Sequence, residues 1–229
     1  ARDDKPFFMD VNFIKMHNPT NAAPDFRGKS HLGDYSDSLM EMDADIGRIM
    51  DAIRAEAPNT IVIVTADNGA WLDAYPDAGT TPFRSEKATN WEGAVRVPEM
   101  IRWPGKIKPR SVSNEIVQHH DWLPTFLAAA GEPDIVEKLK QGHQAGEMTY
   151  KVHIDGYNLL PYLTGDVDKS PRRGMIYFSD DCDVLGIRAE NWKVVFMEQR
   201  CQGTLQLWFE PFTKLRAPKL FNLRTDPYE

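Results

Sequence analysis

An aspartate and an asparagine, Asp67 and Asn68, stand directly after the apolar run Ile61-Val-Ile-Val64 and directly before Gly69. Such a continuous β-branched run predicts a strand buried on both faces of a parallel sheet. Ligands of open α/β sheets bind outside the carboxyl ends of the strands, so the pair occupies a favoured position for a site. Carboxylate and amide oxygens are hard donors that suit Ca²⁺ or Mg²⁺. A simple turn, for which Asn-Gly is a common signal, is the alternative that these residues leave open.

Two further polar residues could act at the same edge of the sheet. Lys87 lies 20 positions beyond Asp67 in a long turn-rich loop, from which a lysine could fold back and neutralise an anionic ester oxygen. His17 follows the run 6–13, where an imidazole could bind an anion or protonate a leaving oxygen. A solvated surface lysine and a structural histidine are the plainer interpretations of these two residues.

Two other polar clusters are weaker candidates. His119 and His120 are adjacent, and adjacent side chains of an extended backbone point to opposite faces, so capping of a following helix by Asp121 is the better account of that cluster. The acidic stretch 180–183 lies between two strand-like runs and is interpreted as a solvated turn. No chemistry is assigned to either cluster.

The elements that would position these residues follow an α/β order. Apolar residues recur at steps of three and four over 35–56, which predicts a helix, and the strand 61–64 follows the Pro58-Asn59 break. A second strand region is expected over 95–103. A helix is expected from Asp121 to a cap at Gly131.

The rest of the chain has a different character. The segment 132–152 is polar and weakly patterned, which favours a surface excursion, and 155–165 predicts a turn and a short helix. Beyond it, short runs at regular intervals predict a small antiparallel sheet. The strands of that sheet are expected at 175–178, 185–188, 192–196 and 219–223. We expect one unit over 1–168 and a second over 169–229, with a boundary near 165–172.

Composition narrows the function classes. The 229 residues carry a formal charge of −7 without a Lys/Arg-rich run, which argues against nucleic acid as a partner. No apolar run reaches the roughly 20 residues that a membrane span needs. The two cysteines, Cys182 and Cys201, have no CxxC partner, so free thiols are slightly favoured over one disulfide. The strand-like run 6–13 begins without a preceding element to pair with, so we expect further sequence upstream.

Five sequence words in register resemble the type I sulfatases of the alkaline-phosphatase-like superfamily, with the closest likeness to bacterial arylsulfatases. These words are Phe13-Ile-Lys-Met-His17, Thr65-Ala-Asp-Asn-Gly69, the stretch from Thr81 to Pro98, Arg102-Trp-Pro-Gly105 and the stretch from Leu220 to Pro227. The resemblance implies that Asp67 and Asn68 are ligands of a divalent cation, calcium first and magnesium as the alternative. It implies that His17 and Lys87 contact the sulfate group and the leaving oxygen of the substrate.

The departures from the family pattern matter as much. A sulfatase also needs a Cys/Ser-x-Pro-x-Arg segment, whose first residue is oxidised to formylglycine, and an acidic pair that completes the metal shell. Neither Cys182 nor Cys201 is followed by that pattern. The resemblance therefore places the nucleophile in a missing N-terminal half. The expected fold class is α/β: the second half of an alkaline-phosphatase-like mixed-sheet sandwich, with a small C-terminal antiparallel sheet.

The implied function is calcium-dependent, arylsulfatase-like hydrolysis of a sulfate monoester. The expected partners are the sulfate ester and the N-terminal half of the same protein, and this chain alone is expected to be inactive. Two alternatives stay open: a phosphonate or phosphodiester hydrolase of the same superfamily, and a non-catalytic domain that binds a sulfated ligand.

Overall fold

The computed structural model of the chain describes residues 5–72, 80–201 and 205–229. The helices are α1 (Asp34–Glu56), α2 (Glu92–Val95), the 3₁₀ helix η1 (His119–Asp121), α3 (Trp122–Ala129), α4 (Ile135–Gln141), α5 (Leu160–Thr164) and the 3₁₀ helix η2 (Leu205–Trp208). The strands are β1 (Val62–Thr65), β2 (Glu99–Arg102), β3 (His143–Ala145), β4 (Met148–Tyr150), β5 (Gly174–Phe178), β6 (Val184–Ala189), β7 (Trp192–Glu198) and β8 (Thr213–Asn222). Within the described part of the chain, no helix is long and apolar enough to cross a membrane.

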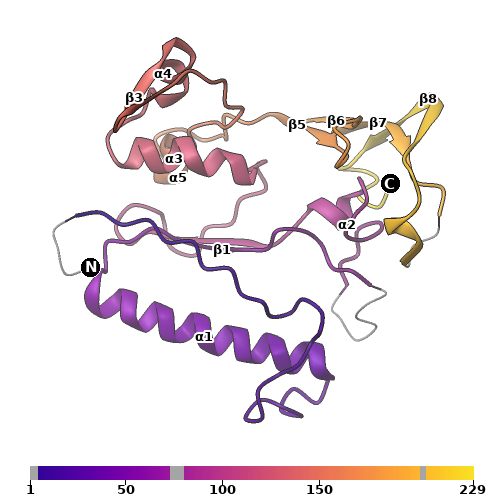
Figure 1. Cartoon of the computed structure of the whole chain (residues 1–229), viewed down its shortest axis with the longest axis horizontal. Coiled ribbons are helices and arrows are strands. Elements are labelled where there is room, and N and C mark those ends of the chain that lie inside the picture. The colour runs from indigo at the N-terminus through magenta and orange to yellow at the C-terminus, as the bar shows by residue number, and fades with distance from the viewer. Residues whose placement is uncertain (1–4, 73–79, 202–204) are drawn as a thin grey trace.

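The long helix α1 confirms the first periodic prediction and lies along one side of the molecule (Figure 1). Asp34 and Asp37 stand in its first turn and Arg54 in its last, where each charge complements the helix dipole. The Asp37 carboxylate also accepts hydrogen bonds from the backbone nitrogens of Gly28 and Ser30, at 2.5 and 2.8 Å. These bonds fix the preceding loop against the start of the helix.

Strand β1 forms where the β-branched run predicts it, but among the described residues it does not lie in a parallel sheet. Within the described residues β1 pairs with β2 alone, in antiparallel register, with Val62 opposite Arg102 and Val64 opposite Met100. Three of its four residues are half-buried and Thr65 is exposed, so the strand is not covered on both faces. The apolar run identified the strand correctly, while its neighbours depend on residues far away in the sequence.

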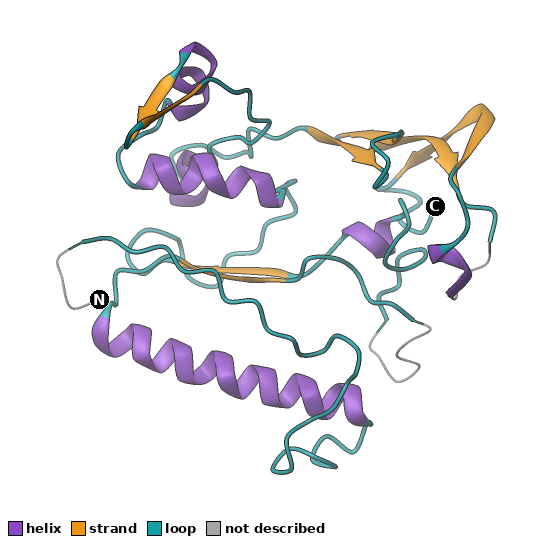
Figure 2. Cartoon of the chain, in the orientation of Figure 1, coloured by secondary structure: helices purple, strands orange, loops and turns teal. Residues whose placement is uncertain are grey.

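The run 6–13 is not a strand, which corrects the expectation for the start of the chain. It has no ladder partner among the described residues and follows an irregular course, drawn as a loop in Figure 2. Phe8 and Met9 are 77% and 68% exposed. A strand exists only through hydrogen bonds to a neighbour, so apolar composition alone does not form one.

The segment 132–152 is more ordered than its polarity suggested. It contains α4 and a hairpin of β3 and β4, and Gly146 in the turn adopts the positive φ of +61°. Ile135 and Leu139 are buried at helical spacing, and α4 contacts both α3 and β3. That four-residue spacing was the signal for the helix that the sequence interpretation missed.

The C-terminal antiparallel sheet is confirmed, in the strand order β5-β6-β7-β8 (Figures 1 and 2). One face is buried, through Tyr177, Leu185, Lys193 and Val195. The other face carries a row of opposed residues, Ile176, Ile187, Val194 and Leu220, of which all but Val194 are at least 40% exposed. The sheet therefore attaches to the rest of the molecule through one face.

The link before this sheet and the turn inside it also follow the sequence. Gly165 ends α5 with a φ of +83°, and residues 166–173 form neither helix nor strand. The boundary between 1–168 and 169–229 falls in that link and stays a prediction. The 180–183 stretch is a turn between β5 and β6, closed by the Cys182 nitrogen donating to the Ser179 carbonyl at 3.0 Å. Cys182 and Cys201 are both free thiols.

Candidate active site

The turn after β1 presents two oxygen-bearing side chains. Asp67 is exposed and Asn68 half-buried. The Asn68 backbone nitrogen donates to the Asp67 carboxylate at 2.9 Å, and the Asn68 side-chain nitrogen donates to the Gly69 carbonyl at 2.9 Å. The backbone bends at these two residues, and with the amide nitrogen engaged, the side-chain oxygen of Asn68 is available to a ligand. The turn and the binding site are therefore compatible interpretations.

Two glycines bring this turn against α2, and α2 against the loop that precedes it. The Gly69 nitrogen donates to the Ala94 carbonyl at 2.7 Å, and a Cβ on Gly69 would overlap the carbonyl oxygen of Gly93. A Cβ on Gly93 would in turn overlap the carbonyl oxygens of Arg84 and Ser85. The three backbone segments can approach this closely because neither glycine has a side chain.

Lys87 lies on the loop that these contacts hold. Its backbone nitrogen donates to the Ala70 carbonyl at 3.1 Å, and the buried carboxylate of Glu86 accepts a hydrogen bond from the Leu72 nitrogen at 2.7 Å. The half-buried Lys87 side chain places its ammonium 5.7 Å from the centre of the Trp208 ring. The loop therefore docks on the residues just after the Asp67-Asn68 turn.

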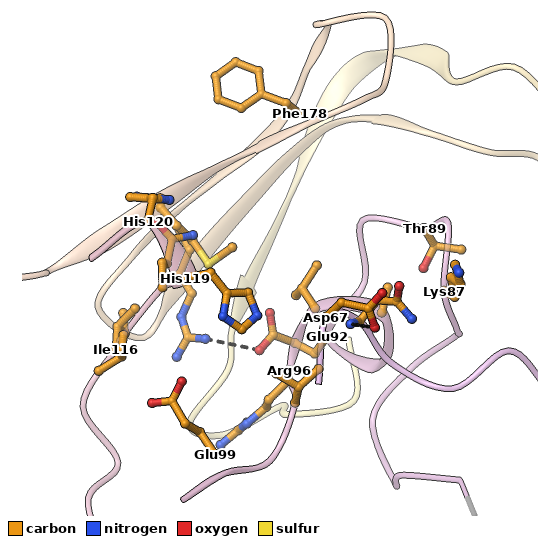
Figure 3. A pocket seen from close by; sticks show the side chains of 18 of the residues that line it. Asp67, Lys87, Thr89, Glu92, Arg96, Glu99, Ile116, His119, His120 and Phe178 are labelled. Atoms are coloured by element: carbon orange, nitrogen blue, oxygen red, sulfur yellow. Dashed lines mark hydrogen bonds and ion pairs between the residues drawn. The ribbon is translucent and has the colours of Figure 1, made fainter. Parts of the chain in front are cut away.

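Asp67, Asn68 and Lys87 line one broad cleft of about 1500 Å³. The structure thus brings together three of the four residues that the sequence singled out. Other parts of its wall come from β2, from the segment leading to η1, and from the C-terminal sheet. Figure 3 shows side chains from these elements facing the same space, with Asp67 and Lys87 at one end.

His17, the fourth residue, is not among the described residues that line this cleft. Its side chain is exposed, and its Nδ1 lies 3.1 Å from the Asn18 carbonyl oxygen. The role of His17 therefore stays a prediction from the resemblance, without support from its position.

His119 is a cleft residue that the sequence interpretation set aside. Its ring points into the cleft (Figure 3), and Nε2 lies 3.1 Å from the carbonyl oxygen of Ala66, the residue before Asp67. Nearby, burial raises the pKa of the Glu99 carboxyl, and the charge of His119 opposes that shift. Both histidines lie in the 3₁₀ helix η1 and both line the cleft, so the expectation of an extended backbone at this pair is wrong.

His120 turns to a buried ion pair, which corrects the account of Asp121. Asp121 makes no side-chain capping bond to α3, although its carboxylate accepts the backbone nitrogen of Gln118 at 2.9 Å in the capping box of η1. Its buried carboxylate instead pairs with Arg172 at 2.6 Å and accepts the backbone nitrogen of Tyr157 at 2.8 Å. The Arg172 guanidinium also donates to His120 Nε2 at 2.7 Å, and burial together with that positive charge lowers the pKa of His120. A buried carboxylate finds the strongest available partner, and here that partner is 51 residues away.

A divalent cation fits the chemistry of the Asp67-Asn68 turn only in part. Both side chains offer the hard oxygen atoms that calcium prefers, at an exposed turn with room for a ligand. Calcium takes six to eight such atoms, and the described residues contain no group of three or more His, Cys, Asp or Glu side chains able to hold a metal. The two residues therefore suit one side of a coordination shell.

Comparisons with known proteins identify relatives of this chain. Residues 1–132 match the sulfatase family model. The chain is 32% identical to human arylsulfatase A over the whole of this chain and 44% of that protein, and 32% identical to mouse steryl-sulfatase over 76% of this chain and 27% of that protein. The PsFucS1 sulfatase structure from Pseudoalteromonas sp. superposes with a TM-score of 0.77 at 26% identity, covering 94% of this chain and 41% of that one. The chain spans less than half the length of these relatives, and it belongs to the sulfatase family.

Proposed function

We propose that this chain forms part of a sulfuric ester hydrolase that cleaves a sulfate monoester with the help of calcium. One observation carries the proposal: in a member of the sulfatase family, Asp67, Asn68 and Lys87 line a single cleft. Hard oxygen donors can hold a cation. The cation and a nearby lysine would then stabilise an anionic ester whose leaving oxygen gains negative charge.

Asp67 and Asn68 would hold the cation through their side-chain oxygens. When bound, calcium would supply positive charge that polarises the sulfate group as a Lewis acid and template. The turn needs little rearrangement for this role, because its own hydrogen bonds already orient both side chains. The remaining ligands would come from other residues of the complete protein.

Lys87 would bind a sulfate oxygen and stabilise the negative charge that develops as the S–O bond breaks. Its loop is held by backbone contacts, so the backbone of Lys87 is fixed before the substrate arrives. His17 is proposed, on the resemblance alone, to contact the sulfate group or protonate the departing alcohol.

The nucleophile is proposed to be a formylglycine in another part of the complete protein. Cys182 lies in an exposed turn and Cys201 is half-buried beyond β7, and neither begins the Cys-x-Pro-x-Arg pattern. We therefore expect the 229-residue chain alone to hydrolyse no aryl sulfate.

The test uses the complete protein and 4-nitrophenyl sulfate. We expect turnover that a calcium chelator abolishes and that added calcium restores. Asp67→Asn should weaken the response to calcium, and Lys87→Ala should lower kcat/KM by about 10²-fold, the usual loss for one charge-stabilising group. Lys151→Ala, at an exposed lysine outside the cleft, is the matched control and should change nothing. Absence of sulfatase activity alongside efficient cleavage of phenyl phosphonates would refute the proposal.

A further inference from the structure

Glu92 is the first residue of α2 and follows directly on the loop that carries Lys87. Its carboxylate is buried. Its side chain is 1% exposed. The carboxylate accepts hydrogen bonds from the Tyr177 hydroxyl at 3.0 Å, from Arg188 at 3.1 Å and from Lys193 at 3.4 Å. These donors stand on β5, β6 and β7 in that order, so one carboxylate binds three neighbouring strands.

Opposite charges meet in the cluster around Glu92, and Arg84 also reaches it, donating to the backbone oxygen of Glu229 at 3.0 Å. Lys193 is fully buried, and its ammonium also lies 2.6 Å from the buried carboxylate of Glu229. Two carboxylates thus face two cations, the second being Arg188, and removing one buried charge would leave its partner uncompensated. Burial, with the negative charge of Glu92, raises the pKa of Tyr177, so its hydroxyl keeps the proton that it donates.

Gly93, the residue after Glu92, connects Glu92 to the cleft through backbone contacts. The Gly93 nitrogen donates to the Arg84 carbonyl at 2.8 Å, and Gly93 has no space for a side chain against that loop. The adjoining Ala94 carbonyl accepts the Gly69 nitrogen at 2.7 Å. A displacement of Glu92 would therefore move both the Lys87 loop and the turn after β1.

We propose that Glu92 is a positioning residue, and that through it the C-terminal sheet sets the place of Lys87 relative to Asp67 and Asn68. The sheet is then part of the active-site scaffold and has no independent role as an appended unit. The kinetic part of this inference rests on the proposed sulfatase function, whereas the structural part does not.

The chain itself allows a direct test through the environment of Lys87. Its ammonium lies 5.7 Å from the Trp208 ring, so reductive ¹³C-methylation should give a ring-shifted NMR signal, assigned by its loss in Lys87→Arg. We expect Glu92→Gln to move this signal towards that of exposed lysines, because a neutral amide cannot balance both cations. Glu190→Gln, the same change at an exposed ion pair of the same sheet, should leave the signal in place.

In the complete protein, Glu92→Gln should lower kcat by about 10- to 100-fold, the scale of a misplaced catalytic group, with KM changed less than about 3-fold. Tyr177→Phe removes one hydrogen bond and no charge, so it should fold and give a smaller change of the same kind, and it decides the matter if Glu92→Gln does not fold. An unmoved Lys87 signal in both variants, or an equal shift in Glu190→Gln, would overturn the proposal. If the wild-type protein cleaves no sulfate ester, the proposed function fails while the NMR result still stands.

Discussion

The carbonyl oxygen of Gly93 occupies the space that a side chain on Gly69 would need. This contact joins the turn that carries Asp67 and Asn68 to α2, which in turn bonds to the loop that carries Lys87 through the Gly93 nitrogen and the Arg84 carbonyl. Any larger residue at either position would have to separate them.

Gly69→Ala is therefore expected to lower the free energy of unfolding by about 3 kcal/mol, as overpacking against rigid backbone does. Gly47→Ala is the matched control, because Gly47 lies inside α1 with nothing within 4 Å of its added Cβ. That change should stabilise the protein by about 0.5–1 kcal/mol through helix propensity. Urea denaturation measures both, and equal effects would contradict the packing account.

Replacing two adjacent arginines, Arg172 and Arg173, should lower the free energy of unfolding by very different amounts. Arg172 pairs with the buried Asp121, so Arg172→Met leaves a carboxylate uncompensated and should cost about 3–5 kcal/mol. Arg173 pairs with Glu190 in solvent, and Arg173→Met should stay within about 1 kcal/mol of the wild type. Chemical denaturation of both variants checks the contrast, and a small loss for Arg172→Met would show that Asp121 finds another partner.

The raised pKa of the Glu99 carboxyl should make the stability of the protein depend on pH. Burial raises its folded pKa, so its favourable contribution is complete below the unfolded pKa of about 4.3 and is lost as pH rises through the folded value. Glu99→Gln, which stays neutral, should therefore have a higher Tm than the wild type at pH 7 and an equal Tm below about pH 4. Glu147→Gln, at an exposed turn position, is the control and should show no such divergence in thermal melts.

The charge of the cleft predicts a preference among sulfate esters. Among the described residues that line it, eight are Asp or Glu and four are Lys or Arg. If the proposed function holds, substrates with further anionic groups should have a KM about 3- to 10-fold higher than neutral monosulfates at low salt, and the gap should narrow at high salt.

Replacing Asp180, Asp181 and Asp183 with asparagine should narrow this gap, because these residues line the cleft. Neutralising Asp43, Asp51 and Glu56, three exposed residues of α1, makes the same change in net charge away from the cleft and should leave the gap intact. Equal effects of the two triple variants would mean that total charge, and not the cleft, governs KM.

Local patterns predicted the elements whose formation is local. The three-and-four spacing gave α1 within a residue of its observed start, and short runs at regular intervals gave the four C-terminal strands, except that β8 begins six residues earlier than predicted. The partner of β1 was not predictable in this way, because Val62 pairs with Arg102, which lies 40 residues further along the chain. Pairing over such distances depends on tertiary packing, which no window of sequence contains.

The candidate site shows the same division. The position of Asp67 and Asn68 at a strand end followed from sequence, and the resemblance added Lys87 to them. The approach of Gly69 to Gly93 and the burial of Glu92 had no local signal, because each depends on contacts with distant segments. His119 was missed because a rule for adjacent side chains of an extended backbone was applied to a pair that lies in a 3₁₀ helix.

The carboxylate of Glu92 has a consequence for how the molecule opens. Glu92 binds three strands from α2, and α2 also accepts a hydrogen bond from the turn after β1. These segments should therefore separate in one cooperative opening event. Backbone amides of Gly69, Gly93 and the inner strands β6 and β7 should then exchange with deuterium at a common opening free energy. Deuterium exchange of the amides of β6 and β7 would thus report on the integrity of the turn after β1, which is far from these strands in the sequence.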